Sequence, residues 1–178
     1  MSREAVGFRR ARRLVGTLAV ALMCGAAAAS ESAPRFSPED RQRFVSIARG
    51  LEQAPLKAGA GAEREWALSW LVDVPDISVT LCPHALGGLA KSKYPHAGEL
   101  LLQNSFSMAA FLIEHPEAAN DPQAQQAAGV EGSLNAYRSI LREKPEAKSK
   151  DLEDLLAMQS RGELPAFIRK AWARCASK

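Results

Sequence analysis

The sequence predicts an all-α protein, with a single compact domain of about five to seven helices in antiparallel pairs behind an N-terminal signal peptide. Three observations support this fold class. Apolar residues recur at spacings of three and four along most of the chain, which is the period of an amphipathic helix. Only one short stretch alternates with a period of two, and no second stretch exists with which it could pair as a strand. Serine, proline and glycine also stand where these helices would begin and end.

Residues 1–30 are predicted to be a secretory signal peptide, with cleavage near Ala29 or Ser30. Two arginine pairs precede an apolar run from Leu14 to Ala29 that ends in small residues, and this order is typical of an export signal. The run has 16 positions, whereas a helix that crosses a bilayer needs about 20 apolar residues. The mature chain is therefore expected to have no transmembrane segment and to be periplasmic or secreted.

Two other features of the leader bear on the export route. The arginine pairs suggest twin-arginine export, but Phe8 stands where a polar residue is usual. Cys24 suggests lipid attachment, but Met23 precedes it in place of a small residue. Ordinary secretion is the simpler interpretation. Residues 31–36 are then expected to be a disordered start, and residues 37–178 to form the helical domain.

The charge distribution argues against a nucleic-acid partner. The full chain has a formal net charge of +3 and a pI near 8.9. Residues 1–30 hold five arginines and one glutamate, so they contribute +4 and the rest of the chain carries −1. The basic excess belongs to the leader, and the domain lacks the positive balance that binding to a phosphate backbone requires.

Two cysteines remain once the leader is removed. Cys82 and Cys175 are 93 residues apart, and in an oxidising compartment they are expected to form a disulfide. The chain-entropy model assigns such a cross-link a stabilisation of about 4–5 kcal/mol. We therefore predict a structural disulfide that fastens the end of the domain to its middle.

The domain is predicted to begin with two helices. Ser37 is a capping residue directly before Pro38, a residue favoured in the first turn of a helix. The apolar stripe that follows consists of Phe44, Ile47, Ala48 and Leu51. The second helix is expected from about residue 62 to residue 73, and its inward face carries Trp66 and Trp70.

Residues 76–82 are ambiguous. Apolar residues alternate there with Ser78 and Thr80, as in a strand. A lone strand, however, leaves its backbone groups without hydrogen bonds, so we favour a short helix capped by Asp76. Residues 83–95 contain two consecutive glycines and are expected to be rich in turns, with about one helical turn.

Residues 97–115 are predicted to form the central helix, because they are apolar on nearly every side. The thin polar line on this helix consists of Glu99, Gln103, Ser107 and Glu114. Further amphipathic helices are expected over residues 122–144, 150–161 and 163–175. Gly129 and Gly132 weaken the first of these three, since glycine disfavours a helix interior.

The sequence contains no motif for nucleophilic catalysis, phosphate binding or metal binding. A zinc site of Cys82, His84 and His96 would have a spacing that matches no common zinc pattern. Oxidation of Cys82 would also remove one of its ligands. Neither a metal ion nor any other cofactor is therefore predicted.

Several polar residues are candidates for a binding site near the start of the central helix. They are Glu99, Gln103, Asn104, His84 and His96. One hypothesis is a small-molecule pocket over residues 98–104, with these side chains as its polar contacts. Another is a hydrolase-like enzyme that uses Glu99 with a histidine as an acid–base pair.

The leading hypothesis is a non-enzymatic protein-interaction module whose partner is another envelope protein. It rests on the rigid helical domain, the disulfide and the lack of polar residues that converge on one point. It predicts a surface groove or apolar patch of several hundred Å². The oligomeric state is left open.

Overall fold

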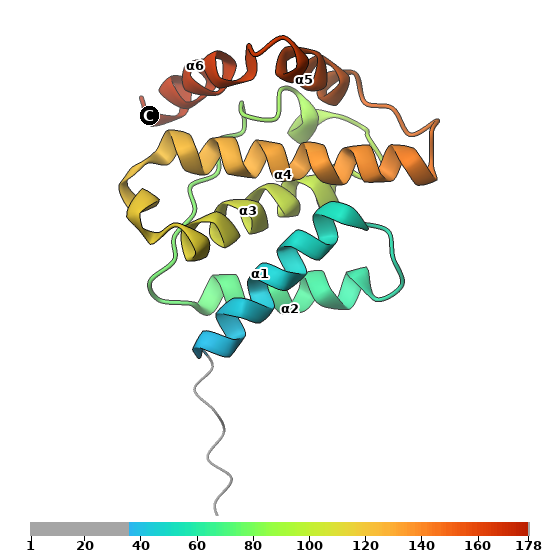
Figure 1. The fold of residues 1–178 in the computed structure, drawn as a ribbon. Helices are drawn as coiled ribbons and strands as arrows, with labels where there is room; N and C mark the ends of the chain where they lie inside the picture. Colours follow the sequence, from blue (N-terminus) through green and yellow to red (C-terminus); the bar gives the residue numbers. More distant parts are fainter. Residues whose placement is uncertain (1–35, 178) are drawn as a thin grey trace, which may run out of the picture. The chain divides into compact units, whose positions relative to one another are not determined.

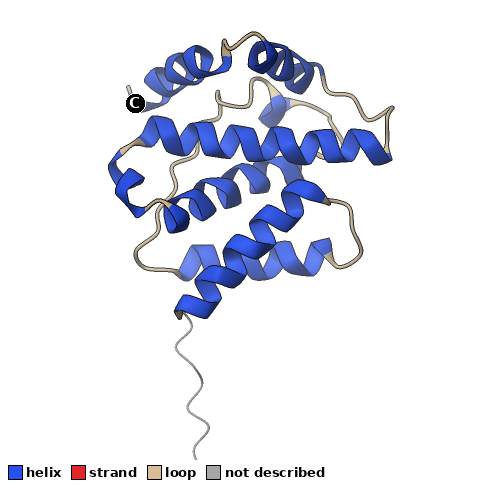
Figure 2. Ribbon diagram, in the orientation of Figure 1, coloured by secondary structure: helices blue, strands red, loops and turns tan. Residues whose placement is uncertain are grey.

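This computed structural model describes residues 36–177 of the chain, which contain six α-helices and two short 3-10 helices joined by loops. They are α1 (Pro38–Gln53), α2 (Ala60–Asp73), η1 (Leu89–Lys91), α3 (Ala97–Glu114), η2 (Pro116–Asn120), α4 (Pro122–Glu143), α5 (Lys150–Ser160) and α6 (Leu164–Ala176) (Figures 1 and 2). These described residues contain no strand, so the prediction of a single all-α domain is confirmed. The predicted signal peptide and residues 31–35 lie outside the described residues. Among the described helices, none is long and apolar enough to cross a membrane.

The predicted cap at the start of α1 is present. The Asp40 N–H donates a hydrogen bond to Ser37 Oγ at 3.1 Å, and the Ser37 N–H donates one to the Asp40 carboxylate at 3.4 Å. This reciprocal pair satisfies two backbone donors that the first turn of a helix would otherwise leave unpaired. The apolar stripe is also confirmed, since Phe44, Ala48 and Leu51 are fully buried.

Helices α3 and α4 lie along each other at the centre of the domain and run antiparallel. Helix α1 packs against both α3 and α4, and α2 covers α3, while α5 and α6 cover α4 on the opposite side (Figure 1). Gly129 and Gly132 explain the close approach of the central pair. A Cβ atom on Gly132 would lie 1.9 Å from Ser107 Oγ, and one on Gly129 would lie 2.8 Å from Met108 Cγ. Glycine at these positions therefore lets the two backbones meet, although it weakens the helix itself.

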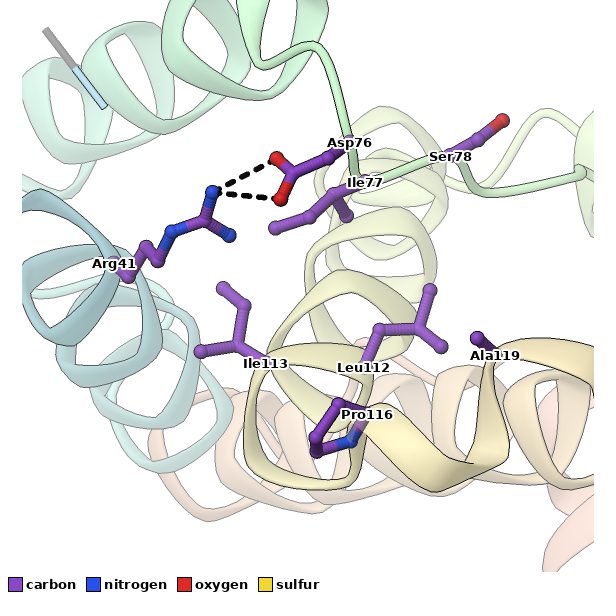
Figure 3. Close-up of a pocket in the computed structure, with 8 residues that line it drawn as sticks. All are labelled: Arg41, Asp76, Ile77, Ser78, Leu112, Ile113, Pro116 and Ala119. Carbon is purple, nitrogen blue, oxygen red and sulfur yellow. Dashed lines mark hydrogen bonds and ion pairs between the residues drawn. The ribbon is translucent and has the colours of Figure 1, made fainter. Parts of the chain in front are cut away.

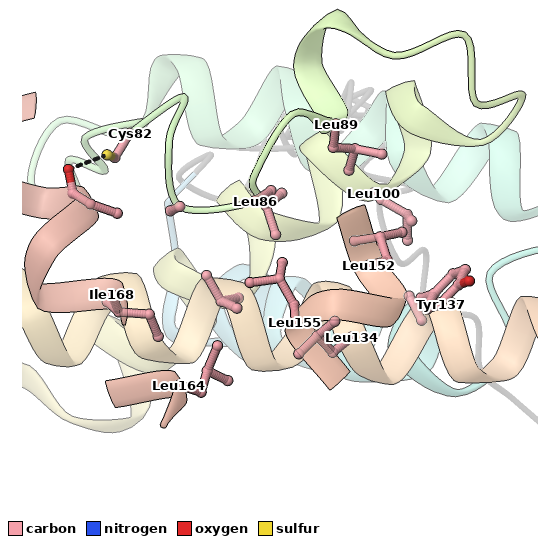
Figure 4. Packing of buried hydrophobic residues seen from close by; sticks show 14 of the residues in the cluster. Cys82, Leu86, Leu89, Leu100, Leu134, Tyr137, Leu152, Leu155, Leu164 and Ile168 are labelled. Carbon is pink, nitrogen blue, oxygen red and sulfur yellow. Dashed lines mark hydrogen bonds between the residues drawn. The ribbon is translucent and has the colours of Figure 1, made fainter. Parts of the chain in front are cut away.

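Two apolar clusters fill the spaces between these layers. One lies between α1, α2 and α3, where the rings of Phe44 and Trp70 are 4.8 Å apart. The other joins the start of α3 to α4, α5, α6 and the segment before η1 (Figure 4). Tyr137 lies in the second cluster, with its ring buried and its hydroxyl bound to Glu153 on α5 at 2.6 Å. The central position predicted for residues 97–115 is thus correct, because α3 contributes to both clusters.

Residues 75–81, which we call the strap, form neither the short helix that we favoured nor a paired strand. The side chains of the strap do alternate between inside and outside. Ile77 and Val79 are half-buried against the α1–α2–α3 cluster, and Ser78 and Thr80 are exposed. The helix prediction was wrong because it assumed that backbone groups need partners within the chain. At the surface, water can take that role. The strap therefore remains an open segment that passes α3 and α4 toward α6 (Figure 1).

The disulfide lies at the end of the strap. Cys82 and Cys175 are bonded, with their Cα atoms 5.7 Å apart. Cys175 shares its face of α6 with Ile168 and Ala171, both buried. The cross-link thus joins the strap to the last helix, as the sequence predicted.

Candidate binding groove

Two of the residues that the sequence singled out lie together at the start of α3. His96 directly precedes the helix and Glu99 is in its first turn, with 3.6 Å between His96 Nδ1 and Glu99 Oε1. The ring of Tyr94 packs edge-on against His96, with 5.7 Å between the ring centres. Burial, with the charge of Glu99 adding to it, raises the pKa of Tyr94 to about 12. Tyr94 therefore keeps its proton and donates a hydrogen bond to the backbone oxygen of Ala147 at 3.1 Å.

Gln103 and Asn104 point into the helix bundle instead. The amide of Gln103 donates hydrogen bonds to the backbone oxygen of Ala48 at 3.0 Å and to Ser107 Oγ at 2.9 Å. Asn104 is 4 % exposed, and its amide nitrogen faces Gly129 on α4. Both side chains are thus placed between helices and away from His96 and Glu99.

His84 lies in a third place. It lines a pocket of about 400 Å³ together with Lys91 and the backbone around Gly87 and Gly88. Three more pockets of 330–340 Å³ open on the described part of the chain. Neither Glu99, Gln103 nor Asn104 lines any of these four pockets. The structure therefore brings only His96 and Glu99 together out of the five candidates.

A polar cluster around the buried Glu52, which the sequence analysis missed, connects α1, α3 and α4. We call this set the polar joint; it consists of Arg49, Glu52, Gln103, Ser107, Asn135 and Ser139. Glu52 is 8 % exposed, and its carboxylate accepts hydrogen bonds from Arg49 at 2.6 Å, Ser107 at 2.7 Å and Asn135 at 3.3 Å. The signal in the sequence was a carboxylate four residues after Ala48, on the apolar stripe itself.

The charges of the polar joint balance one another. Burial alone would lower the pKa of Arg49, but hydrogen bonds and charges from Glu114 and Glu52 outweigh it and raise that pKa, so the guanidinium stays charged. Glu114 accepts from Arg49 Nη2 at 2.5 Å. Ser139 Oγ donates to the backbone oxygen of Glu52 at 3.0 Å. Because the buried members of the joint find partners within the protein, we interpret the joint as structural.

The strap, in contrast, is held by three contacts with distant elements. Arg41 Nη2 on α1 donates to both oxygens of Asp76, at 2.8 and 3.0 Å, and this hydrogen bond holds the pKa of Asp76 below its usual value. Gln126 Nε2 on α4 donates to the backbone oxygen of Thr80 at 2.6 Å. The disulfide at Cys82 is the third contact. The strap is thus fixed near its start at Asp76 and near its end at Thr80 and Cys82.

Pockets open along both sides of the strap, and we call the two together the strap groove. One has a volume of about 330 Å³ and contains Ile77, Leu112 and Ile113 beside the Arg41–Asp76 pair (Figure 3). The other has a volume of about 340 Å³. Its lining consists of Leu68, Leu71, Val72, Val74, Ile77, Ser78, Val79, Leu81 and Ser105. Ile77 and Ser78 line both pockets, so the two pockets lie against the same part of the strap.

Exposed apolar side chains gather at this groove. Leu68 is 40 % exposed, Val72 is 73 % exposed and Leu81 is 59 % exposed, and these are the exposed large hydrophobic residues of the described chain. All three line the second pocket. The only charged side chains that line either pocket are Arg41 and Asp76, which neutralise each other. The groove is therefore open and mostly apolar, with no net charge.

The sequence held a partial signal for this groove. Leu68 and Val72 are four residues apart on α2, on a face different from that of Trp70, which is buried. Such a second apolar stripe on a surface helix needs a partner of its own. The described residues contain no group of three or more His, Cys, Asp or Glu side chains that could hold a metal ion. In the comparisons with known proteins, no family model, no curated protein and no solved structure matches the chain.

Proposed function

We propose that the protein is an exported, non-enzymatic interaction module that binds an apolar segment of another envelope protein in the strap groove. The observation that carries the proposal is the gathering of Leu68, Val72 and Leu81 at one neutral groove. Single exposed apolar residues are ordinary on protein surfaces, whereas a group of them around a groove is typical of an interaction site.

The chemistry of the lining favours a protein segment over a small polar molecule. Small-molecule sites combine apolar walls with a few convergent polar groups that fix the ligand. In the strap groove the charged groups are Arg41 and Asp76, and each is the partner of the other. Apolar side chains of a partner would lose no hydrogen bonds on entering this groove, and their burial would drive binding.

Two observations support export. The leader has the order of a secretory signal. The Cys82–Cys175 disulfide is the form that cysteines take in an oxidising compartment. A periplasmic or secreted protein would meet other envelope proteins as its partners.

Site-directed photo-crosslinking in the cells that make the protein would test the proposal. A photoreactive residue at position 72, in the groove, should give a discrete adduct with a second protein in the envelope fraction. The matched control carries the same residue at position 170, which is exposed on α6. A second control combines the position 72 probe with Leu81→Asp, which should abolish the adduct. Equal adducts at both positions, or none at position 72, would contradict the proposal.

A further inference from the structure

The backbone of the strap offers unused hydrogen-bonding groups. Within the described chain, no N–H group from Ile77 to Leu81 donates a hydrogen bond. Among the carbonyl oxygens of these residues, that of Thr80 accepts one, from Gln126. The neighbouring Ser78 and Thr80 side chains are exposed, so water has access to this backbone.

The strap also has the side-chain alternation of a β-strand. Ile77 and Val79 face the α1–α2–α3 cluster, and Ser78 and Thr80 face outward. A segment with this alternation presents its N–H and C=O groups sideways, where another extended chain can pair with them. It therefore resembles the edge strand of a sheet, although the described chain contains no sheet.

From these features we propose that the partner binds as an extended strand, paired through main-chain hydrogen bonds with residues 77–81. This inference rests on the proposed function and adds the form of the ligand. Strand addition of this kind takes its affinity from main-chain bonds and its specificity from pockets for alternate side chains. The strap offers both, because most of its main-chain groups are unpaired and an apolar pocket lies beside them.

The electrostatics of the groove define the ligand further. Arg41 and Asp76 already pair with each other, so a charged side chain of the ligand would be desolvated without a partner. An amphipathic helix would satisfy its own backbone and leave that of the strap unpaired. The ligand is accordingly an extended, uncharged segment with an apolar residue at every second position.

Amide hydrogen exchange with a synthetic probe would test this inference on the mature protein. The probe is a capped heptapeptide of alternating threonine and valine. Its binding should slow exchange at alternate amides within residues 77–81 by about ten-fold or more, as expected for newly formed hydrogen bonds. The intervening amides and those of α6 should not change.

Two modified probes provide matched controls. N-methylation of the valine amides in one probe, and of the threonine amides in the other, removes donors from opposite edges of the peptide. Only one edge can pair with the strap, so one probe should lose affinity by about ten-fold or more while the other retains it. Equal losses with both probes would contradict strand pairing.

The remaining outcomes separate this inference from the proposed function. An adduct at position 72 without protection of the strap amides would overturn strand pairing and leave the interaction module intact. If the probe does not bind at about 1 mM, strand pairing is overturned. If position 72 also gives no adduct, both proposals fail. A free protein that proves to be a dimer, and that dissociates when the probe binds, would assign the groove to a second copy of this chain and overturn a partner strand.

Discussion

The polar joint and the strap groove differ in what they bury and what they expose. In the joint, four of the six polar residues are buried, and the Glu52 carboxylate accepts hydrogen bonds from three different residues. In the groove, apolar side chains such as Val72 are exposed and the backbone beside them is unpaired. Polar groups that are satisfied internally stabilise a fold, whereas backbone groups that bind only water, next to exposed apolar surface, leave room for an external partner. The difference predicts that mutations in the joint change stability and that mutations in the groove change binding.

Removing the disulfide should have the largest effect, because the bridge both stabilises the fold and fixes the end of the strap beside the groove. Cys175→Ser opens a loop of 93 residues and should lower the free energy of unfolding by about 2–5 kcal/mol. It should also free one end of the strap and weaken probe binding. Guanidinium denaturation and probe titration would measure the two effects. Reduction of the wild-type protein should lower its stability and its probe binding in the same way. A reduced protein with unchanged stability and binding would contradict the role assigned to the disulfide.

A substitution that adds a methyl group where α3 and α4 approach most closely should have the next largest effect on stability. Gly132→Ala places a Cβ within 2 Å of Ser107 Oγ and 2.8 Å from Glu52 Oε1, so the helices must separate, at a cost of about 3 kcal/mol. The matched control is Gly61→Ala on α2, where nothing lies within 4 Å of the new atom. That variant should be more stable than wild type by about 0.5–1 kcal/mol. Thermal unfolding should therefore show a lower melting temperature for Gly132→Ala and a higher one for Gly61→Ala than for wild type.

Loss of the buried carboxylate should have a smaller but clear effect. Glu52→Gln keeps the shape of the side chain and removes its charge, which weakens hydrogen bonds from Arg49, Ser107 and Asn135 by about 1.5–3 kcal/mol in total. Glu131→Gln is the control, since Glu131 lines the same pocket but is exposed. Its unfolding energy should stay within about 0.5 kcal/mol of wild type. Equal effects of the two variants would show that the joint contributes nothing specific.

High pH should weaken the hydrogen bond that Tyr94 donates to Ala147, in the loop between α4 and α5. The pKa of Tyr94 is raised to about 12 in the folded protein, against about 10 in an unfolded chain. The neutral phenol is thus favoured by folding, and its contribution is present below pH 10 and is lost as pH rises through 12. Tyr137, the only other tyrosine, also has a raised pKa, caused by burial and by its hydrogen bond to Glu153.

Ultraviolet titration of the phenols would measure this effect. Both tyrosines should ionise together with unfolding, above the usual pH for tyrosine. Tyr94→Phe should shift the alkaline unfolding midpoint upward, because it removes one of the two groups that titrate. Independent ionisation of either tyrosine near pH 10 in a folded protein would refute the prediction.

Substitutions in the groove should have the smallest effect on stability. Val72→Ser and Leu81→Ser replace exposed side chains and should change the free energy of unfolding by no more than about 0.5 kcal/mol. Both should nevertheless reduce binding of the alternating peptide, which calorimetry would measure. A large loss of stability would mean that these side chains belong to the core rather than to a binding surface.

Most helices were predictable because their determinants are local. Ser37 and Asp40 form a cap within one turn, and Phe44, Ala48 and Leu51 follow the helical period. The predicted second helix began two residues late, since Gly59 in the left-handed conformation precedes its first turn without a side-chain cap. Such boundaries depend on weak local preferences.

The strap and the interior polar residues were not predictable in the same way. The alternation in residues 76–82 was visible, but the side chains that hold the strap come from Arg41, Gln126 and Cys175, far away in the sequence. Gln103 likewise has a partner on α1, the backbone oxygen of Ala48, 55 residues away. No local pattern conveys contacts of this range, so a polar residue on an apolar helix does not reveal whether it faces a ligand or another helix.

The distance along the chain between Cys82 and Cys175 has a consequence for the order of events during protein synthesis. Cys82, at the end of the strap, is synthesised 93 residues before its covalent partner Cys175. Contacts between such remote residues form late, after the intervening helices have assembled. A stalled or truncated product that ends before α6 would therefore carry an unlocked strap, and only a molecule translated through Cys175 could offer a fixed template to another chain.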